Sequence, residues 1–111
     1  MRIEFSDGSL ASQPAFDRYL SESTAPGAVP VRFECAATAG VSDDEISARA
    51  DDALEQRARE EEADILPATV VATRLDEPSG HRRYRVLAIA RRRRPVVETV
   101  IVREEVDPSS A

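Results

Sequence analysis

A sharply marked helix start at residues 42–45 restricts the fold of this chain more than any other feature. The sequence SDDE forms a capping box. In it the Ser42 hydroxyl can accept a hydrogen bond from the Glu45 N–H, and the Glu45 side chain can reach back to the Ser42 N–H. The two aspartates between them lie where the helix dipole favours negative charge. We expect a helix from about residue 43 to 63, ending before Pro67.

The apolar stripe of this helix is thin and rich in alanine, so the helix buries little area for its length. Its other faces carry many carboxylates, which is typical of a solvated surface. The stripe consists of Ile46, Ala50, Ala53, Leu54 and Ala58, with Ile65 and Leu66 near the exit of the helix.

Strand-like segments lie on both sides of the helix. The segment before it alternates with a period of two, which predicts a strand with one buried face. The segments after it are β-branched and separated by turn sequences, which favours an antiparallel meander. The first strand spans residues 31–38, with Val31, Phe33, Cys35 and Ala37 on its apolar side. The later strands span residues 68–75, 82–91 and 96–103.

Two shorter elements come first in the chain, a strand at residues 2–5 and a helix at residues 14–22. The sequence therefore predicts an α+β fold with the element order β-α-β-α-β-β-β. Its sheet is mainly antiparallel, and it has one long and one short helix. A chain of 111 residues suits a single domain, which we place at residues 1–106, followed by a disordered tail at 107–111.

Over residues 31–91 the predicted order strand-helix-strand-strand resembles that of the dodecins, a family of small flavin-storing proteins. The resemblance is limited to the order of elements. No aromatic residue lies at positions 65–69, where the flavin-stacking tryptophan of that family would fall. What the resemblance implies is a small oligomer that binds a small ligand.

Residue types that serve catalysis or metal binding are scarce. Cys35 is the only cysteine and His81 the only histidine, which excludes an intramolecular disulfide, a multi-cysteine zinc site and a two-histidine mechanism. The four glycines are isolated, so no loop cradles a phosphate. We expect Cys35 to be a buried thiol and His81 to be exposed in a turn. The sequence predicts a protein that is not an enzyme and has no metal or cofactor.

The hydropathy pattern favours a cytoplasmic protein that does not bind membranes. No apolar run approaches the roughly 18 residues that a membrane span needs. The first ten residues also lack the apolar segment of a signal peptide.

Charge is distributed unevenly along the chain, whose net charge is −6. Residues 1–66 carry 15 acidic residues and 6 arginines, which gives −9, and residues 67–111 carry 6 and 9, which gives +3. A net acidic protein is a poor general binder of nucleic acid, because contacts to phosphate dominate that affinity. The second part can still present a locally basic surface.

Arginines are concentrated in the last predicted hairpins. We expect pairing of segments 68–75 and 82–91 to bring Arg74 near Arg83 or Arg85 on one face of the sheet. Four adjacent arginines repel one another unless they are solvated or face anions. The cluster consists of Arg82, Arg83, Arg85, Arg91, Arg92, Arg93 and Arg94, with Arg74 and Arg103 on the neighbouring strands.

Three interpretations of this cluster are open. The arginines can meet the acidic helix, within one copy of the chain or between copies. They can face an acidic protein partner, or only solvent at a sheet edge, where charge prevents aggregation. They can also bind phosphate or nucleic acid, since arginine suits bidentate phosphate recognition. Against the third interpretation, Tyr84 is the only aromatic residue interleaved for base stacking.

The last predicted strand is apolar on both faces, with Val97 and Ile101 opposite Val96, Val100 and Val102. One thin helix cannot cover both sides of such a strand, and exposed apolar sheet surface marks an interface. We therefore expect a non-catalytic interaction or assembly module that binds itself or a protein partner. The alternatives are an anion- or nucleic-acid-binding domain that uses the Arg-rich hairpin, and a dodecin-like oligomer that binds a small ligand. The candidate interaction residues are Arg83, Arg85, Arg91, Arg92, Arg93, Arg94, Arg103, Val97 and Ile101.

Overall fold

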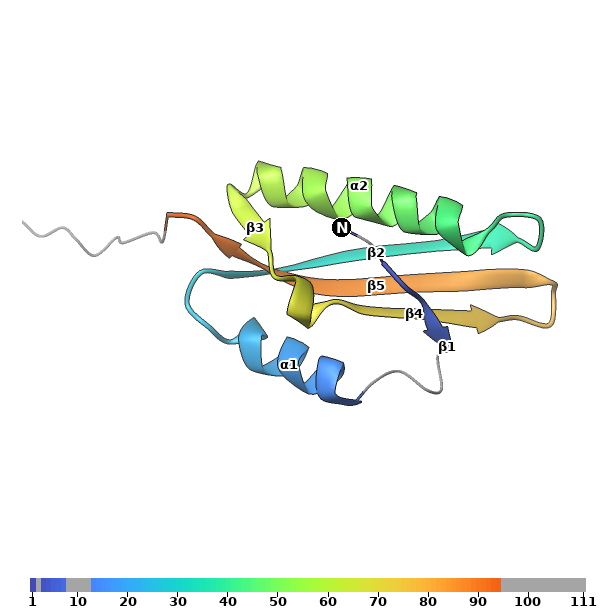
Figure 1. Cartoon of the computed structure of the whole chain (residues 1–111), viewed down its shortest axis with the longest axis horizontal. Coiled ribbons are helices and arrows are strands. Elements are labelled where there is room, and N and C mark those ends of the chain that lie inside the picture. Colours follow the sequence, from blue (N-terminus) through green and yellow to red (C-terminus); the bar gives the residue numbers. More distant parts are fainter. Residues whose placement is uncertain (2, 8–12, 95–111) are drawn as a thin grey trace, which may run out of the picture.

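The computed structural model describes residue 1 and residues 3–7 and 13–94. Two helices and a mostly antiparallel five-stranded sheet make up this part of the chain (Figure 1), which confirms the predicted α+β class. In chain order the elements are β1 (Ser6–Asp7), α1 (Gln13–Ser23), β2 (Ala28–Thr38), α2 (Asp43–Glu60), β3 (Ala63–Ile65), the 3₁₀ helix η2 (Pro67–Thr69), β4 (Val71–Asp76) and β5 (His81–Arg92).

β5 is the central strand of the sheet. β2 pairs with it in antiparallel orientation along its whole length. On the other side of β5, β4 and β3 follow one another along the strand. β1 extends the sheet by a short parallel pair with β4, so the strand order is β1-β4-β5-β2. The pairing of β4 with β5 confirms the expected hairpin.

A tight turn replaces the first part of the strand predicted at 68–75. The Thr69 hydroxyl donates to the Leu66 carbonyl at 2.7 Å and accepts from the Ile89 N–H at 2.9 Å. These bonds hold the chain in the short helix η2 after Pro67, and β4 begins only beyond it. The hydrogen bonds of the Thr69 side chain therefore favour a turn here, although the β-branched composition of the segment favours a strand.

The ends of other predicted elements also shift. α2 ends at Glu60, and Glu62 takes a left-handed φ of 53°, which turns the chain into the unpredicted short strand β3. The N-terminal strand predicted at 2–5 is assigned at Ser6–Asp7. The strand predicted at 96–103 and the tail at 107–111 lie outside the described residues.

The main core lies between α2 and one face of the sheet. Successive residues of a strand point to opposite faces, and the even-numbered residues of β5 point toward α2. Those on β5 are Tyr84, Val86, Ala88 and Ala90, each 0% exposed. α2 contributes Ile46, Ala50, Leu54 and Ala58. Ala53, which we placed in the stripe, is exposed, because it lies off the i, i+4 row of the other four.

The N-terminal segment completes this core beside the thin helix. It crosses the sheet on the same side as α2 (Figure 1). The Ile3 side chain is buried, and its N–H donates to Ser47 Oγ on α2 at 3.2 Å. The Phe5 ring meets the Tyr84 ring edge to face, with centroids 4.9 Å apart. Apolar residues from a second segment thus supply volume that the alanines of α2 do not.

The start of α2 is held to the sheet by polar contacts. The Ser42 hydroxyl accepts from the Glu45 N–H at 3.2 Å, which confirms the predicted N-cap. Arg74 lies opposite Tyr84 in the sheet and forms an ion pair with Asp43 at the start of α2. The prediction that Arg74 shares a face with Arg83 and Arg85 is therefore wrong, because one residue of register places a side chain on the opposite face.

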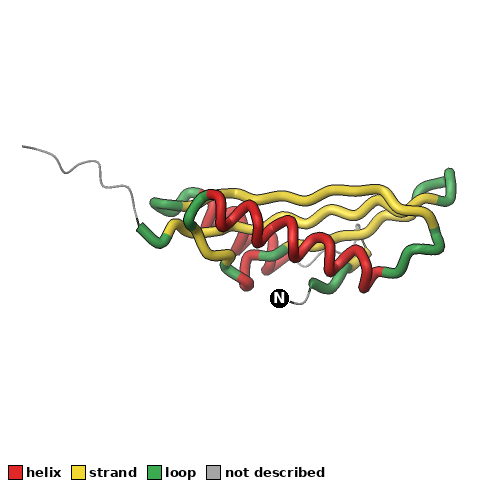
Figure 2. The backbone as a smooth tube through the Cα atoms, turned by 90° about the horizontal axis from the view of Figure 1, so that it is seen from above, coloured by secondary structure: helices red, strands yellow, loops and turns green. Residues whose placement is uncertain are grey.

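Within residues 3–7 and 13–94, the opposite face of the sheet is covered at one end only. α1 lies beside that end, on the other side of the strands from α2 (Figure 1), and contributes no buried residue. Its Phe16 and Leu20 side chains stay 37% and 49% exposed. α2, in contrast, runs along the layer of long strands (Figure 2). The two sides of the sheet thus have very different cover.

Candidate interaction face

The arginines of β5 divide between the two faces of the sheet. Arg82 and Arg92 point to the side of α2, whereas Arg83, Arg85 and Arg91 point to the side of α1, as the period of two requires. The candidate residues therefore do not form one continuous surface.

The run of arginines at the end of β5 is used within the chain. Arg91 forms an ion pair with Glu22 of α1. Arg92 Nη2 lies 2.8 Å from Glu61 Oε1, just after α2, and Arg93 Nε lies 3.1 Å from Asp64 Oδ1 on β3. Three successive arginines thus connect the strand to α1, to the residue that caps the end of α2, and to β3. Arg94 is exposed at the end of the described range.

Beyond α1, part of the same sheet face has no covering element among the described residues. We call this part the open face. The strand register places its members side by side on three neighbouring strands. They are Arg32, Glu34 and Ala36 of β2, Thr73 and Leu75 of β4, and Arg83 and Arg85 of β5.

Charges on the open face are paired but exposed. Glu34 Oε2 lies 3.2 Å from Arg85 Nε and 3.6 Å from Arg32 Nε, while Arg83 Nε lies 3.1 Å from Glu77 Oε2. The Arg32 and Arg85 side chains remain 67% and 55% exposed. Ion pairs this exposed contribute roughly 0–1 kcal/mol, so they can rearrange toward another charged surface at little cost.

The open face also carries apolar surface. Leu75 is 55% exposed, the largest exposure among the large apolar residues of the described chain. Ala36 is exposed as well, and Leu87 is half-buried where the open face meets the end covered by α1. The register places Arg83 of the central strand between Leu75 and Ala36. Arginine is enriched at protein interfaces, so this mixture of arginine and exposed apolar surface is consistent with one.

A polar cluster that the sequence analysis did not identify lies on the other side of the sheet. The Tyr84 hydroxyl donates to Asp43 Oδ1 at 2.7 Å, and Asp43 is also paired with Arg74 and, at 3.7 Å, with Arg82. We call these four residues the Asp43 cluster. Burial and, after it, the hydrogen bond to Asp43 raise the pKa of the Tyr84 hydroxyl. Because Tyr84 is fully buried, it cannot stack on a base.

Cys35 and His81 are the remaining candidates for chemistry. Cys35 is half-buried, which differs from the expected full burial because it lies toward the end of the edge strand β2. Burial raises the pKa of its thiol, and the nearby charge of Arg49 lowers it. His81 is exposed, as expected, with Nδ1 3.1 Å from Ser79 Oγ.

Within residues 1, 3–7 and 13–94, no group of three or more His, Cys, Asp or Glu side chains is placed to hold a metal ion. In the same part of the chain, neither helix combines the length and the hydropathy that crossing a membrane would need.

Three of the candidate interaction residues, Val97, Ile101 and Arg103, lie outside the described residues. The apolar strand on which they were predicted therefore contributes nothing to the geometry above. Of the other candidates, Arg83 and Arg85 lie on the open face. Arg91 lies at the end beside α1, Arg92 points to the side of α2, and Arg93 and Arg94 follow β5.

Comparisons of this chain with protein-family models, with curated proteins and with solved structures found no match. The dodecin-like order of elements gains no support from them. Any function must therefore be argued from the contacts and charges of the chain itself.

Proposed function

We propose that this protein is a non-catalytic interaction module that associates with a second copy of itself through the open face. The observation that carries the proposal is a sheet face, lined by Leu75, Ala36 and exposed arginines, that no element of the described chain covers. The other face of the same sheet is closed by a helix and an N-terminal segment.

The charges of the open face favour a second copy over a partner of a single sign. The face carries arginines and, between and beside them, Glu34 and Glu77. A two-fold axis presents the same patch on both partners, so each arginine can meet a carboxylate of the other copy. A strongly acidic partner would meet these carboxylates with like charge.

The size of the open face sets the expected strength. Three strands about 4.8 Å apart and some six residues long span roughly 15 by 20 Å. Such a patch, about 300 Å² on each copy, is smaller than a standard specific interface, so we expect weak and transient association, with a dissociation constant in the micromolar range or above. The exposed ion pairs within one copy are consistent with a weak interface, because they can form without a partner.

Molar mass measured by light scattering during size-exclusion chromatography tests the proposal. Association should appear as a rise in mass as concentration increases. Arg85→Glu should abolish the rise in mass, because the new carboxylate repels Glu34. The double variant Glu34→Arg with Arg85→Glu should restore it, because the two charges are opposite again. Arg59→Glu on the exposed surface of α2 is the matched control.

A monomer at every concentration up to about 500 µM would contradict the proposal, because a micromolar dissociation constant predicts mostly dimer at that concentration. Association that persists in Arg85→Glu would place the interface elsewhere. Far-UV circular dichroism of each variant separates loss of association from loss of fold.

A further inference from the structure

A pocket lies at the end of the sheet that α1 covers, away from the open face. It has a volume of about 220 Å³ and opens between α1 and the turn before β4. Its floor comes from consecutive residues around η2: Leu66, Pro67, Ala68 and Thr69. Arg18 and Glu22 of α1 and Arg91 of β5 complete the lining.

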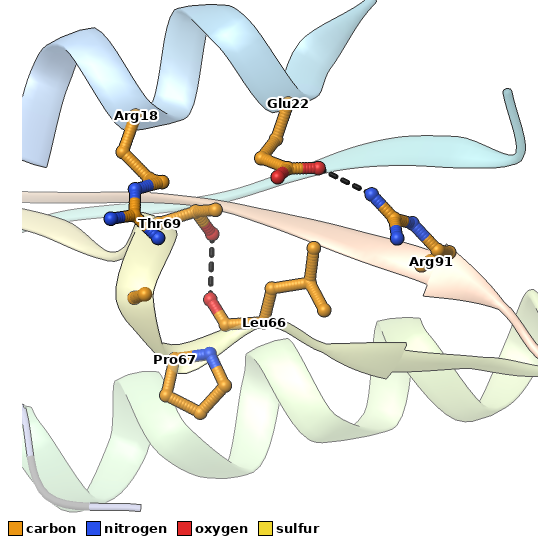
Figure 3. Close-up of a pocket in the computed structure, with 7 residues that line it drawn as sticks. Arg18, Glu22, Leu66, Pro67, Thr69 and Arg91 are labelled. Carbon is orange, nitrogen blue, oxygen red and sulfur yellow. Dashed lines mark hydrogen bonds and ion pairs between the residues drawn. The ribbon is translucent and has the colours of Figure 1, made fainter. Parts of the chain in front are cut away.

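The two α1 residues point into this site from one face of the helix, because they are four positions apart. Figure 3 shows Arg18 and Glu22 both extending from α1 toward the strand and the turn, with Thr69 near Arg18 and the Leu66 side chain below Glu22. Glu22 reaches Arg91, to which it is paired. Arg18 forms no ion pair with any residue in the described ranges.

The balance of charge in the site is positive in a protein of net charge −6. Two guanidinium groups line it against one carboxylate, and that carboxylate is already bonded to Arg91. The free guanidinium of Arg18 is therefore the group that an incoming anion would meet. Guanidinium binds a carboxylate through two parallel hydrogen bonds.

The floor offers an incoming molecule few side-chain hydrogen bonds. The Thr69 hydroxyl already donates to the Leu66 carbonyl at 2.7 Å and accepts from the Ile89 N–H at 2.9 Å. Leu66, Pro67 and Ala68 present only apolar side chains. A molecule that fits must carry its charge at one end and apolar groups at the other.

We propose that this pocket binds small monocarboxylates with a short alkyl chain. The carboxylate pairs with Arg18 at the mouth of the pocket, and the alkyl chain lies on the floor beside Leu66. The ligand competes with Glu22 for the positive charge of the site, since the carboxylates of both are attracted to the same two arginines. This inference is independent of the proposed self-association.

Butyrate is the probe that tests it, in a titration followed by the amide chemical shifts of the whole chain. We expect saturable shifts confined to the pocket residues, with a dissociation constant on the order of 1 mM for so small a ligand. Butyramide has the same shape without the charge, and inorganic phosphate has charge without the alkyl chain. Both should bind at least roughly tenfold more weakly.

Two substitutions in the pocket should act in opposite directions. Arg18→Gln should weaken butyrate binding about tenfold, because it removes the charge-assisted hydrogen bonds. Glu22→Gln should strengthen it several-fold, because it frees Arg91 and removes a competing carboxylate. Arg59→Gln, an exposed arginine on α2, should leave the affinity unchanged.

No saturable shift with butyrate, or equal affinity in Arg18→Gln and the unsubstituted protein, overturns the proposal. Tighter binding of phosphate than of butyrate would show that the alkyl chain does not contribute to binding. Weaker butyrate binding in Glu22→Gln would show that Glu22 does not compete with the ligand for the arginines. Dispersed amide spectra of each variant confirm that it is folded.

Discussion

The two faces of the sheet differ in burial and in the exposure of their charged side chains. On the side of α2, four β5 residues are fully buried, and the charged Asp43 is bonded to a buried tyrosine and paired with arginines. On the open face, the side chains of the same strand form ion pairs that remain about half exposed. The same strand thus supplies a closed core from its even positions and an accessible surface from Arg83 and Arg85, whereas the odd position Ile89 is buried at the end beside α1.

This difference shows where the stability of the fold must come from. Removing apolar surface from water contributes about 25 cal/mol per Å², and most of the buried apolar residues of the described chain lie on the α2 side. Exposed ion pairs contribute little. The open face is therefore free to change for binding without cost to the fold, and the predictions below compare matched positions on the two sides.

Two leucines give the largest expected contrast. Leu54 is 1% exposed in the core and Leu75 is 55% exposed on the open face. Leu54→Ala should lower the free energy of unfolding by about 3 kcal/mol, because the small neighbours on α2 and β5 cannot fill the cavity. Leu75→Ala should change it by less than about 0.5 kcal/mol. Urea denaturation followed by circular dichroism measures both, and equal effects would refute the contrast.

The Asp43 cluster gives the next effect. Tyr84→Phe removes the hydroxyl that donates to Asp43 at 2.7 Å and should cost about 1.5 kcal/mol. Tyr19→Phe, on the sparsely packed α1, should cost almost nothing. A loss for Tyr84→Phe no larger than for Tyr19→Phe would mean that the cluster does not stabilise α2.

The same tyrosine predicts a dependence on pH. Its pKa is raised in the folded protein, so the protonated hydroxyl is favoured by folding. This stabilisation is complete below pH about 10, the ordinary tyrosine pKa, and is lost as the pH rises through the folded value. Denaturation measured from pH 8 to alkaline pH should show this loss, and Tyr84→Phe should reduce it. An unchanged slope in that variant would exclude Tyr84 as the cause.

The helix and strands of the closed side could be predicted because their signals are local. The Ser42 cap and the alternation in residues 31–38 depend on a few neighbouring residues. The exposure of Ala53 could not be predicted, because it depends on how α2 packs against distant segments. The turn at Thr69 could not be predicted either, because its side chain forms hydrogen bonds that replace the strand.

The sites were harder to predict than the fold. Arg74 was expected near Arg83 or Arg85, but a register set by the whole hairpin places it with Asp43 on the other face. Arg18 and Glu22 had the spacing of residues on one helix face, yet nothing in the sequence indicates which turn they meet. Charge runs such as Arg91–Arg94 show where arginines are, whereas tertiary structure decides which are already paired.

The ends of the two helices give a smaller contrast. Ser42 accepts from the Glu45 N–H at the start of α2, and Ser23 donates to the Leu20 carbonyl at the end of α1. Ser42→Ala should lower the stability by about 1 kcal/mol, the usual effect of removing an N-cap. Ser23→Ala should have a smaller effect, because α1 buries no residue. Thermal denaturation of both variants checks the order, and a reversed order would show that α1 contributes more than its burial indicates.

The arginines of β5 give the smallest effect on stability. Arg92 pairs with Glu61 at 2.8 Å, and both side chains are partly buried at 37% and 23% exposure. Arg85 pairs with Glu34 at 3.2 Å in a more exposed setting. Arg92→Ala should cost up to about 1 kcal/mol, and Arg85→Ala should fall within about 0.5 kcal/mol of zero. Self-association should respond in the reverse order, so that Arg85→Ala weakens it and Arg92→Ala does not. If both properties followed the same order, the open face would be a structural surface like the rest of the sheet, and its role in binding would be excluded.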